Sequence, residues 1–177
     1  MATKEIMVKL KDPFDPFDIE WRVQSAGETK HGKLWAIVVP YVENRAIQER
    51  LDNVCGVDGW YNKYEYPTEK SVICGISIKF QDGQNTNWIT KWDGAGETAI
   101  EAVKGGLSNA MKRAAVQWGI GRYLYKLEAV IITPVDKQPA DTSDYIMAQV
   151  KLNNVKKRLW FKRPKLPVWA LPGTDNE

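Results

Sequence analysis

The chain has 177 residues, of which 44% are hydrophobic and 27% charged, a balance typical of a globular domain with a core. No run of about 18 apolar residues occurs, so no membrane span is expected, and the polar segment 1–18 predicts no secretory signal. Two cysteines and a single histidine, His31, argue against a metal centre and against histidine-based catalysis, and they fit a reduced, cytoplasmic setting.

The charges are unevenly distributed along the chain. Residues 1–150 carry 18 basic and 20 acidic side chains, whereas residues 151–177 carry 7 basic and 2 acidic ones. If the protein binds a polyanion, the folded part must therefore do so through a local patch, and the basic tail adds electrostatic attraction.

The N-terminal region is predicted to contain a flexible arm and then a strand. Two prolines oppose regular structure in the arm, residues 1–18. A first strand is expected at residues 19–24. Its alternation sends the neighbours Trp21 and Arg22 to opposite faces, one buried and one exposed. The alternative interpretation of Arg22 is a surface arginine paired with Glu20 or another neighbour.

A second strand is expected at residues 34–39, followed by a helix that Pro40 opens and Gly56 ends. Three strands of an antiparallel meander come next. The middle one alternates apolar residues with a period of two, and an Asp-Gly pair joins it to the third. These strands are expected at residues 60–66, 71–81 and 86–92.

A long helix follows, with an apolar stripe on one side. Thr98 and Glu101 form a capping box that predicts its start, and Gly119 and Gly121 are expected to end it. The stripe is expected to pack on the sheet. It comprises Ile100, Val103, Leu107, Ala110, Met111, Ala114 and Trp118.

A short strand is expected at residues 128–133, then a linker, a weak helix at residues 142–159 and an extended end. The predicted fold is α+β: an antiparallel β-meander packed on a long helix in the order β-β-α-β-β-β-α, with a basic C-terminal tail. The predicted division is an arm at 1–18, a folded domain at 19–135, and a linker with a partly disordered tail at 136–177.

The other side of the long helix is cationic. Lys104, Ser108 and Lys112 lie on one line, four residues apart, with Gly105 and Gly106 beside them. A glycine inside a helix costs about 1 kcal/mol relative to alanine, so two adjacent ones indicate close approach of another backbone. That backbone is either nucleic acid or a neighbouring subunit, and the alternative is a solvated lysine face.

Two other motifs suggest chemistry. The pairs of glycines at 94–96 and 119–121 lack the GxxxxGK[ST] pattern of a phosphate loop, which excludes ATP binding and predicts no cofactor. Asp93, Glu97 and Glu101 resemble the carboxylate cluster of a metal-dependent nuclease, although acidic residues at a helix N-terminus are also favoured by the helix dipole.

Aromatic residues are numerous and could stack nucleic-acid bases. Most of them are instead expected in the core of the sheet. The set comprises Trp60, Tyr61, Tyr64, Tyr66, Trp88, Trp92, Tyr123 and Tyr125.

The chain resembles the Rad52 superfamily of single-strand annealing proteins, and its phage Sak-type branch in particular. The resemblance rests on DGAGET and VKGGLSNAMKRAAVQWGIGRYLY, with PFDPFDIEWRVQ upstream and GVDGWY between them. It covers residues 13–125, and its most specific part is KRA…WGxGRYLY.

The resemblance implies DNA-contacting residues. Arg22 matches the strand arginine that contacts the DNA backbone, and Lys112 and Arg113 match the Lys-Arg pair of the long helix. Lys70 and Lys104 are looser matches, by position only, to a second, outer DNA contact. The basic tail after residue 150 matches no motif of the family.

The implied function is ATP-independent binding and annealing of single-stranded DNA in recombination. The family's subunits form rings or arcs with the DNA in a basic groove, so the chain is predicted to be a non-enzymatic homo-oligomer in a bacterial host cell, encoded by a bacteriophage. The host's single-strand-binding protein is a further candidate partner. Two alternatives stay open: the nuclease that uses Asp93, Glu97 and Glu101, and an oligomeric scaffold.

Overall fold

The computed structural model describes residues 3–69, 71–82, 84–96 and 102–173. The chain forms two compact units, each built from separate segments: unit 1 comprises Met1–Phe14 and Val42–Tyr123, and unit 2 comprises Asp15–Tyr41 and Leu124–Glu177. Both combine helical segments with antiparallel strands, which confirms the α+β class. No helix among the described residues is long and apolar enough to cross a membrane.

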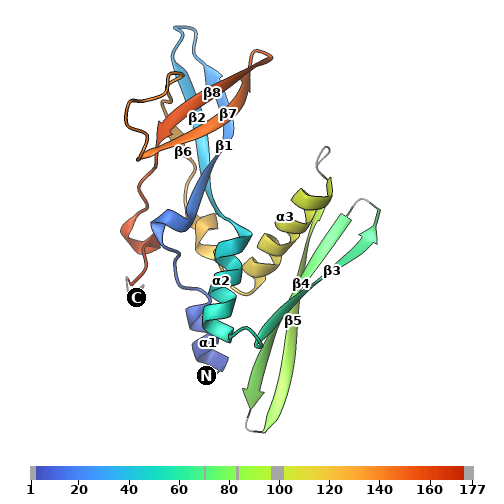
Figure 1. Ribbon diagram of the computed structural model, residues 1–177. Coiled ribbons are helices and arrows are strands. Elements are labelled where there is room, and N and C mark those ends of the chain that lie inside the picture. Colours follow the sequence, from blue (N-terminus) through green and yellow to red (C-terminus); the bar gives the residue numbers. More distant parts are fainter. Residues whose placement is uncertain (1–2, 70, 83, 97–101, 174–177) are drawn as a thin grey trace. The chain divides into compact units, whose positions relative to one another are not determined.

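A three-stranded antiparallel meander and a long helix form the centre of unit 1. The strands are β3 (Trp60–Thr68), β4 (Ser71–Asp82) and β5 (Asn85–Gly96), and α3 (Ala102–Gln117) runs along one face of their sheet (Figure 1). The predicted alternation in β4 is confirmed, because every apolar residue of the series is buried. The series is Val72, Cys74, Ile76, Ile78 and Phe80.

Trp118 connects the end of α3 with the sheet. Its indole Nε1–H donates a hydrogen bond to the buried carbonyl oxygen of Ile76 at 2.9 Å, and its ring lies 6.0 Å from that of Phe80. Gly119 and Gly121 then adopt positive φ values of 92° and 67°, which glycine reaches without strain. The predicted end of the helix is therefore confirmed.

Two further helices complete unit 1: α1 (Thr3–Lys9) and α2 (Asn44–Cys55). Arg50 of α2 donates to the carbonyl oxygens of Lys9, Asp12 and Pro13 at 3.2, 2.6 and 3.1 Å. It also lies 4.4 Å above the ring of Phe14. One side chain thus binds the N-terminal segment to α2.

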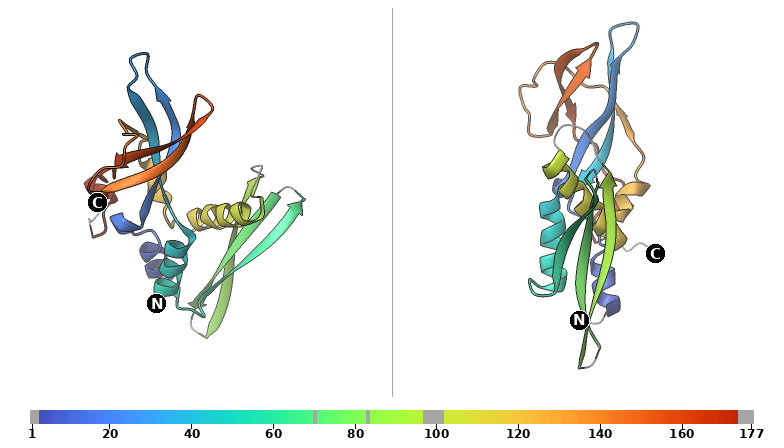
Figure 2. Two further views of the ribbon diagram at one scale, coloured as in Figure 1. Left: turned by 45° about the horizontal axis from the view of Figure 1, so that its top comes forward. Right: turned by 90° about the vertical axis from the view of Figure 1, so that its right-hand side faces the viewer.

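Unit 2 contains the sheet β1–β2–β6 and the hairpin β7–β8 (Figure 2). Val135 and Trp160 exchange two backbone hydrogen bonds of 2.8 Å, and Arg163 Nη1 donates to the carbonyl oxygen of Ile19 at 2.8 Å. The strands are β1 (Ile19–Glu28), β2 (Leu34–Val42), β6 (Val130–Ile132), β7 (Tyr145–Leu152) and β8 (Val155–Lys162); the short 3-10 helices of the chain are η1 (Pro16–Asp18), η2 (Arg122–Lys126) and η3 (Val168–Ala170).

The predicted flexible arm is wrong for its first half. Ile6 and Leu10 are buried and stand four residues apart, as on one face of a helix, and Phe14 is buried beyond the end of α1. The two prolines stand after α1 and so do not interrupt it. The predicted division of the chain at residues 18 and 135 stays a prediction.

Two other local predictions are corrected. Pro40 does not open a helix, because β2 continues to Val42. Strand β2 pairs with β6 only at residues 36–38, so Pro40 stands outside the paired part. The weak helix at 142–159 is the hairpin β7–β8, turned by Asn153 and Asn154 at φ values of 49° and 65°. Asparagine adopts such values more readily than most residues, and they suit a two-residue hairpin turn.

Candidate nucleic-acid interface

Lys112 and Arg113 lie on the part of α3 that is not buried against the sheet. Met111 and Ala114, on either side of them in the sequence, are almost completely buried, whereas Arg113 is exposed and Lys112 is half-buried. Asn109 and Gly105 lie on the same side of the helix, about one and two turns before Lys112 respectively. Gly105, Asn109, Lys112 and Arg113 together form a cationic surface of α3 on which the side chains nearest its N-terminal end are small.

Asp93 fixes the position of Arg113. Its Oδ1 accepts hydrogen bonds from Arg113 Nε at 3.0 Å and from the backbone N–H of Gly94 at 2.7 Å, and its Oδ2 accepts one from Gln117 Nε2 at 2.8 Å. Desolvation raises the pKa of Asp93, but these hydrogen bonds and the charge of Arg113 outweigh it, so the pKa lies below its ordinary value. Asp93 is an ionised anchor for Arg113.

The two glycines of α3 have different surroundings. A Cβ atom on Gly105 would meet nothing within 4 Å, whereas one on Gly106 would lie 3.2 Å from Val72 Cγ1 of β4. The close packing of helix on sheet thus accounts for Gly106. Gly105 faces open space, and within the described residues no contact requires a glycine there.

A second group of cations lies at the C-terminal end of α3. Lys91 Nζ and Arg122 Nη2 both donate to the carbonyl oxygen of Gln117, at 3.0 and 2.9 Å. Desolvation lowers the pKa of Lys91, and the positive charges of Arg122 and Lys11 lower it further. These cations satisfy the helix terminus and extend its positive surface. Sequence reasoning missed this group because its members come from three separate segments.

Arg22 has the predicted orientation on β1. Trp21 is 5% exposed and Arg22 is exposed, so the alternation is confirmed. Arg22 belongs to unit 2, whereas Lys112 and Arg113 belong to unit 1. The structure thus describes Arg22 separately from the other two, and the common role of the three in binding DNA stays a prediction.

Several predicted residues cannot be placed. Lys70, Glu97 and Glu101 lie outside the described residues, as does Thr98 of the predicted capping box, and of Lys104 only the helical backbone is described. Among the described residues no group of three or more His, Cys, Asp or Glu side chains could hold a metal ion.

The prediction that most aromatic residues fill the core is wrong. Tyr61, Trp88 and Trp92 are 41%, 43% and 38% exposed. Their pairing partners in β4 are Ser77, Lys79 and Gly75, which alternate with the buried apolar series and so face away from α3. The side chains of β4 alternate between the two faces of the sheet. The aromatic side chains gather on the face opposite the one that α3 covers.

Glycine makes room for this aromatic face. A Cβ atom on Gly75 would lie 2.6 Å from the ring of Trp92, which covers that position. The rings of Tyr61 and Trp88 are in contact, with centroids 5.0 Å apart. Exposed rings on a sheet can stack nucleic-acid bases or pack against a protein partner.

Comparison with known proteins identifies the family. The model of the Rad52/22 family double-strand break repair proteins matches residues 2–142. The Single-stranded DNA-binding protein DdrA of Deinococcus radiodurans is 32% identical over 180 residues, which cover 100% of this chain and 72% of that protein. DdrA of Deinococcus deserti is 29% identical, with coverage of 100% and 74%. The chain belongs to the Rad52/22 family of double-strand break repair proteins.

Proposed function

We propose that this protein binds single-stranded DNA and anneals complementary strands in recombinational repair, without ATP and without making or breaking covalent bonds. Family membership supports the proposal, and so does the name of its two bacterial relatives, which are single-stranded DNA-binding proteins. The observation that carries it is the face of α3, where Gly105 leaves open space and Arg113 is exposed yet held in place by Asp93.

In this mechanism the cations hold phosphates. Lys112 and Arg113 contact the DNA backbone on unit 1, Arg22 contacts it on unit 2, and Lys70 and Lys104 provide an outer contact. An arginine with a fixed guanidinium binds phosphate with little loss of conformational freedom. Because backbone contacts carry no sequence information, binding is independent of sequence and sensitive to salt. The bases face outward and can meet a complementary strand.

A homo-oligomer, a ring or an arc, would align these contacts along one strand. The annealed duplex would be held less tightly, because its geometry no longer fits a groove shaped for a single strand. The phage origin, the ring, the cytoplasmic location and a contact with the host's single-strand-binding protein stay predictions.

The test is an oligonucleotide binding and annealing assay without ATP. Lys112→Ala, Arg113→Ala and Arg22→Ala should each weaken binding, and each should lower the slope of log K against log salt by about 1. The matched control is Lys137→Ala, which removes an exposed lysine outside the proposed groove. Binding that is unchanged in both Lys112→Ala and Arg22→Ala would contradict the assignment of these residues.

The same assay separates the alternatives. Labelled single strands that are shortened in the presence of magnesium would indicate a nuclease. Oligomers of defined size without affinity for single strands would indicate a scaffold.

A further inference from the structure

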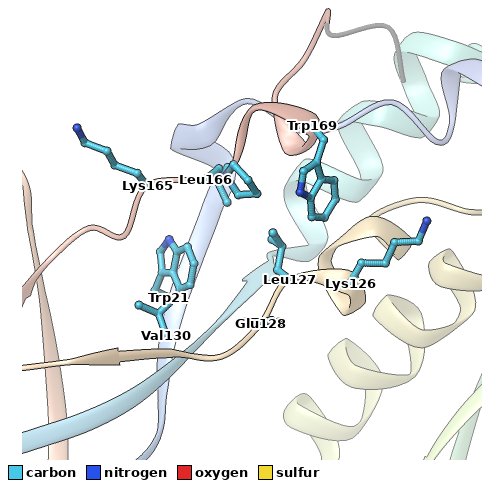
Figure 3. Close-up of a pocket in the computed structure, with 9 residues that line it drawn as sticks. Trp21, Lys126, Leu127, Glu128, Val130, Lys165, Leu166 and Trp169 are labelled. Carbon is cyan, nitrogen blue, oxygen red and sulfur yellow. The ribbon is translucent and has the colours of Figure 1, made fainter. Parts of the chain in front are cut away.

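Unit 2 contains a cavity of about 350 Å³ between two tryptophans (Figure 3). Trp21 and Trp169 stand at two sides of it, with Leu127 and Leu166 between them. Trp21 is almost completely buried, whereas Trp169 is 38% exposed. Trp21 thus forms a fixed aromatic wall of the cavity, and the ring of Trp169 still has exposed surface that a ligand can cover.

The wall that contains Trp169 is anchored on both sides. Before it, Arg163 donates to the carbonyl oxygen of Ile19 at 2.8 Å. After it, Ala170 is fully buried, and its N–H donates to the carbonyl oxygen of Pro167 at 2.9 Å. The segment that carries Lys165, Leu166 and Trp169 is therefore positioned by the fold and forms a preformed site. It lies beyond residues 2–142, the part that matches the family.

Charged side chains surround the apolar slot. Lys126 and Lys165 also line the cavity, and their amino groups extend to opposite sides in Figure 3. No ion pair within the described residues involves either lysine. Glu128 contributes one carboxylate to the lining, so the lining carries a net positive charge.

We propose that this cavity binds one base of single-stranded DNA, stacked on Trp169, while Lys126 and Lys165 contact the phosphates on either side of that base. The proposal rests on the proposed function. In a strand each base has a phosphate before and after it, which fits an apolar slot with a cation at each end. Tryptophan stacks on any base, and about 350 Å³ is within the usual range of small-ligand sites.

The experiment measures binding of the full chain to a labelled oligo-dT and to the same oligonucleotide with abasic positions. Trp169→Ala should weaken binding to oligo-dT about 5-fold to 100-fold and leave the salt slope unchanged. Lys126→Gln and Lys165→Gln should each lower that slope by about 1. The wild type should lose affinity for the abasic strand, whereas Trp169→Ala should bind both strands alike.

Three controls keep the result clear. Val168→Ala alters a neighbouring exposed residue that does not line the cavity, and Lys137→Gln removes an exposed lysine outside it and outside the basic tail. Both should bind as the wild type does. Trp169→Phe keeps an aromatic ring and should retain part of the affinity even if Trp169→Ala unfolds.

The proposal is overturned if Trp169→Ala and Trp169→Phe both bind oligo-dT as tightly as the wild type does. It is also overturned if the abasic positions reduce the affinity of Trp169→Ala as much as they reduce that of the wild type. Wild-type protein that binds no single strand at all would instead overturn the proposed function, and this inference with it. A Lys126→Gln or Lys165→Gln variant with the wild-type salt slope would contradict the phosphate contacts.

Discussion

Asp93 of β5 accepts a hydrogen bond from Arg113 of α3 at 3.0 Å, and the two side chains form an ion pair. The same carboxylate accepts from Gln117, one turn further along the helix. A single acidic residue therefore joins the last strand of the meander to two turns of α3. It stabilises the fold and orients a cation that the proposed function needs.

Asp93→Asn should lower stability at neutral pH by at most about 1 kcal/mol, because Arg113 is well exposed and surface pairs are screened by solvent. The pKa of Asp93 is depressed, so the ionised carboxylate stabilises the fold above the ordinary value of about 3.9. That contribution is lost as pH falls through the folded-state pKa. Thermal unfolding midpoints of both proteins should converge in acid; a difference that is constant with pH would contradict this role.

The two helical glycines should respond differently to alanine. Gly105→Ala places its methyl group in open space, so the gain in helix propensity should stabilise the protein by about 0.5–1 kcal/mol. Gly106→Ala gains the same propensity, but its methyl group meets Val72 Cγ1 at 3.2 Å. Urea unfolding of the two variants should therefore show the smaller gain, or a loss, at Gly106.

The Gly105→Ala variant also tests why that glycine is there. If DNA or a neighbouring subunit approaches this turn, the variant should be more stable and yet bind or oligomerise less well. A variant that is more stable, binds single strands as tightly and forms oligomers of the same size would show that neither approaches it.

Trp118→Phe should lower the free energy of unfolding by about 1–3 kcal/mol. The change removes the donor to the buried Ile76 carbonyl oxygen and leaves space in a well-packed core. Denaturant unfolding measures the loss. Trp88→Phe is the matched control, because Trp88 is 43% exposed and should change stability by less than about 0.5 kcal/mol. Equal effects of the two substitutions would contradict the packing described for Trp118.

Both thiols should react slowly in the folded protein. Burial raises the pKa of Cys55 to about 11, and burial also raises the pKa of Cys74 to about 11. Because the thiolate is the reactive form, a disulfide reagent at about pH 8 should modify neither residue quickly, and both should react once the protein is unfolded in denaturant. Rapid reaction of Cys74 in the native protein would contradict its burial.

Strong local patterns made much of unit 1 predictable. The period of two in β4 and the glycines after Trp118 each determine local structure by themselves, whereas Gly83 of the predicted Asp-Gly turn lies outside the described residues. The sequence did not predict α1, because two prolines close behind it oppose regular structure and only one pair of apolar residues, Ile6 and Leu10, has the helical spacing. The hairpin β7–β8 was missed because its signal, Asn153-Asn154, is weaker than Asn-Gly.

The candidate sites depended more on tertiary structure. A sequence motif identified Lys112 and Arg113. The ion pair of Arg113 with Asp93 could not be predicted, because periodicity does not reveal which strand a helix covers. The same limit applies to Trp92 over Gly75 and to the cavity of Trp21 and Trp169. Each joins residues that are close in space and separated by at least 17 positions in the chain.

The division of the chain into alternating segments affects how the protein is made. The sheet of unit 1 is complete once residue 96 has been synthesised, and α3 follows directly after it. Strands β1 and β2 leave the ribosome earlier, yet β6, which pairs with β2, begins only at Val130. Since synthesis adds about 5–20 residues per second, β2 stays without this partner for several seconds. Unit 1 can therefore fold first, and truncation before residue 130 should leave an unpaired, aggregation-prone strand edge.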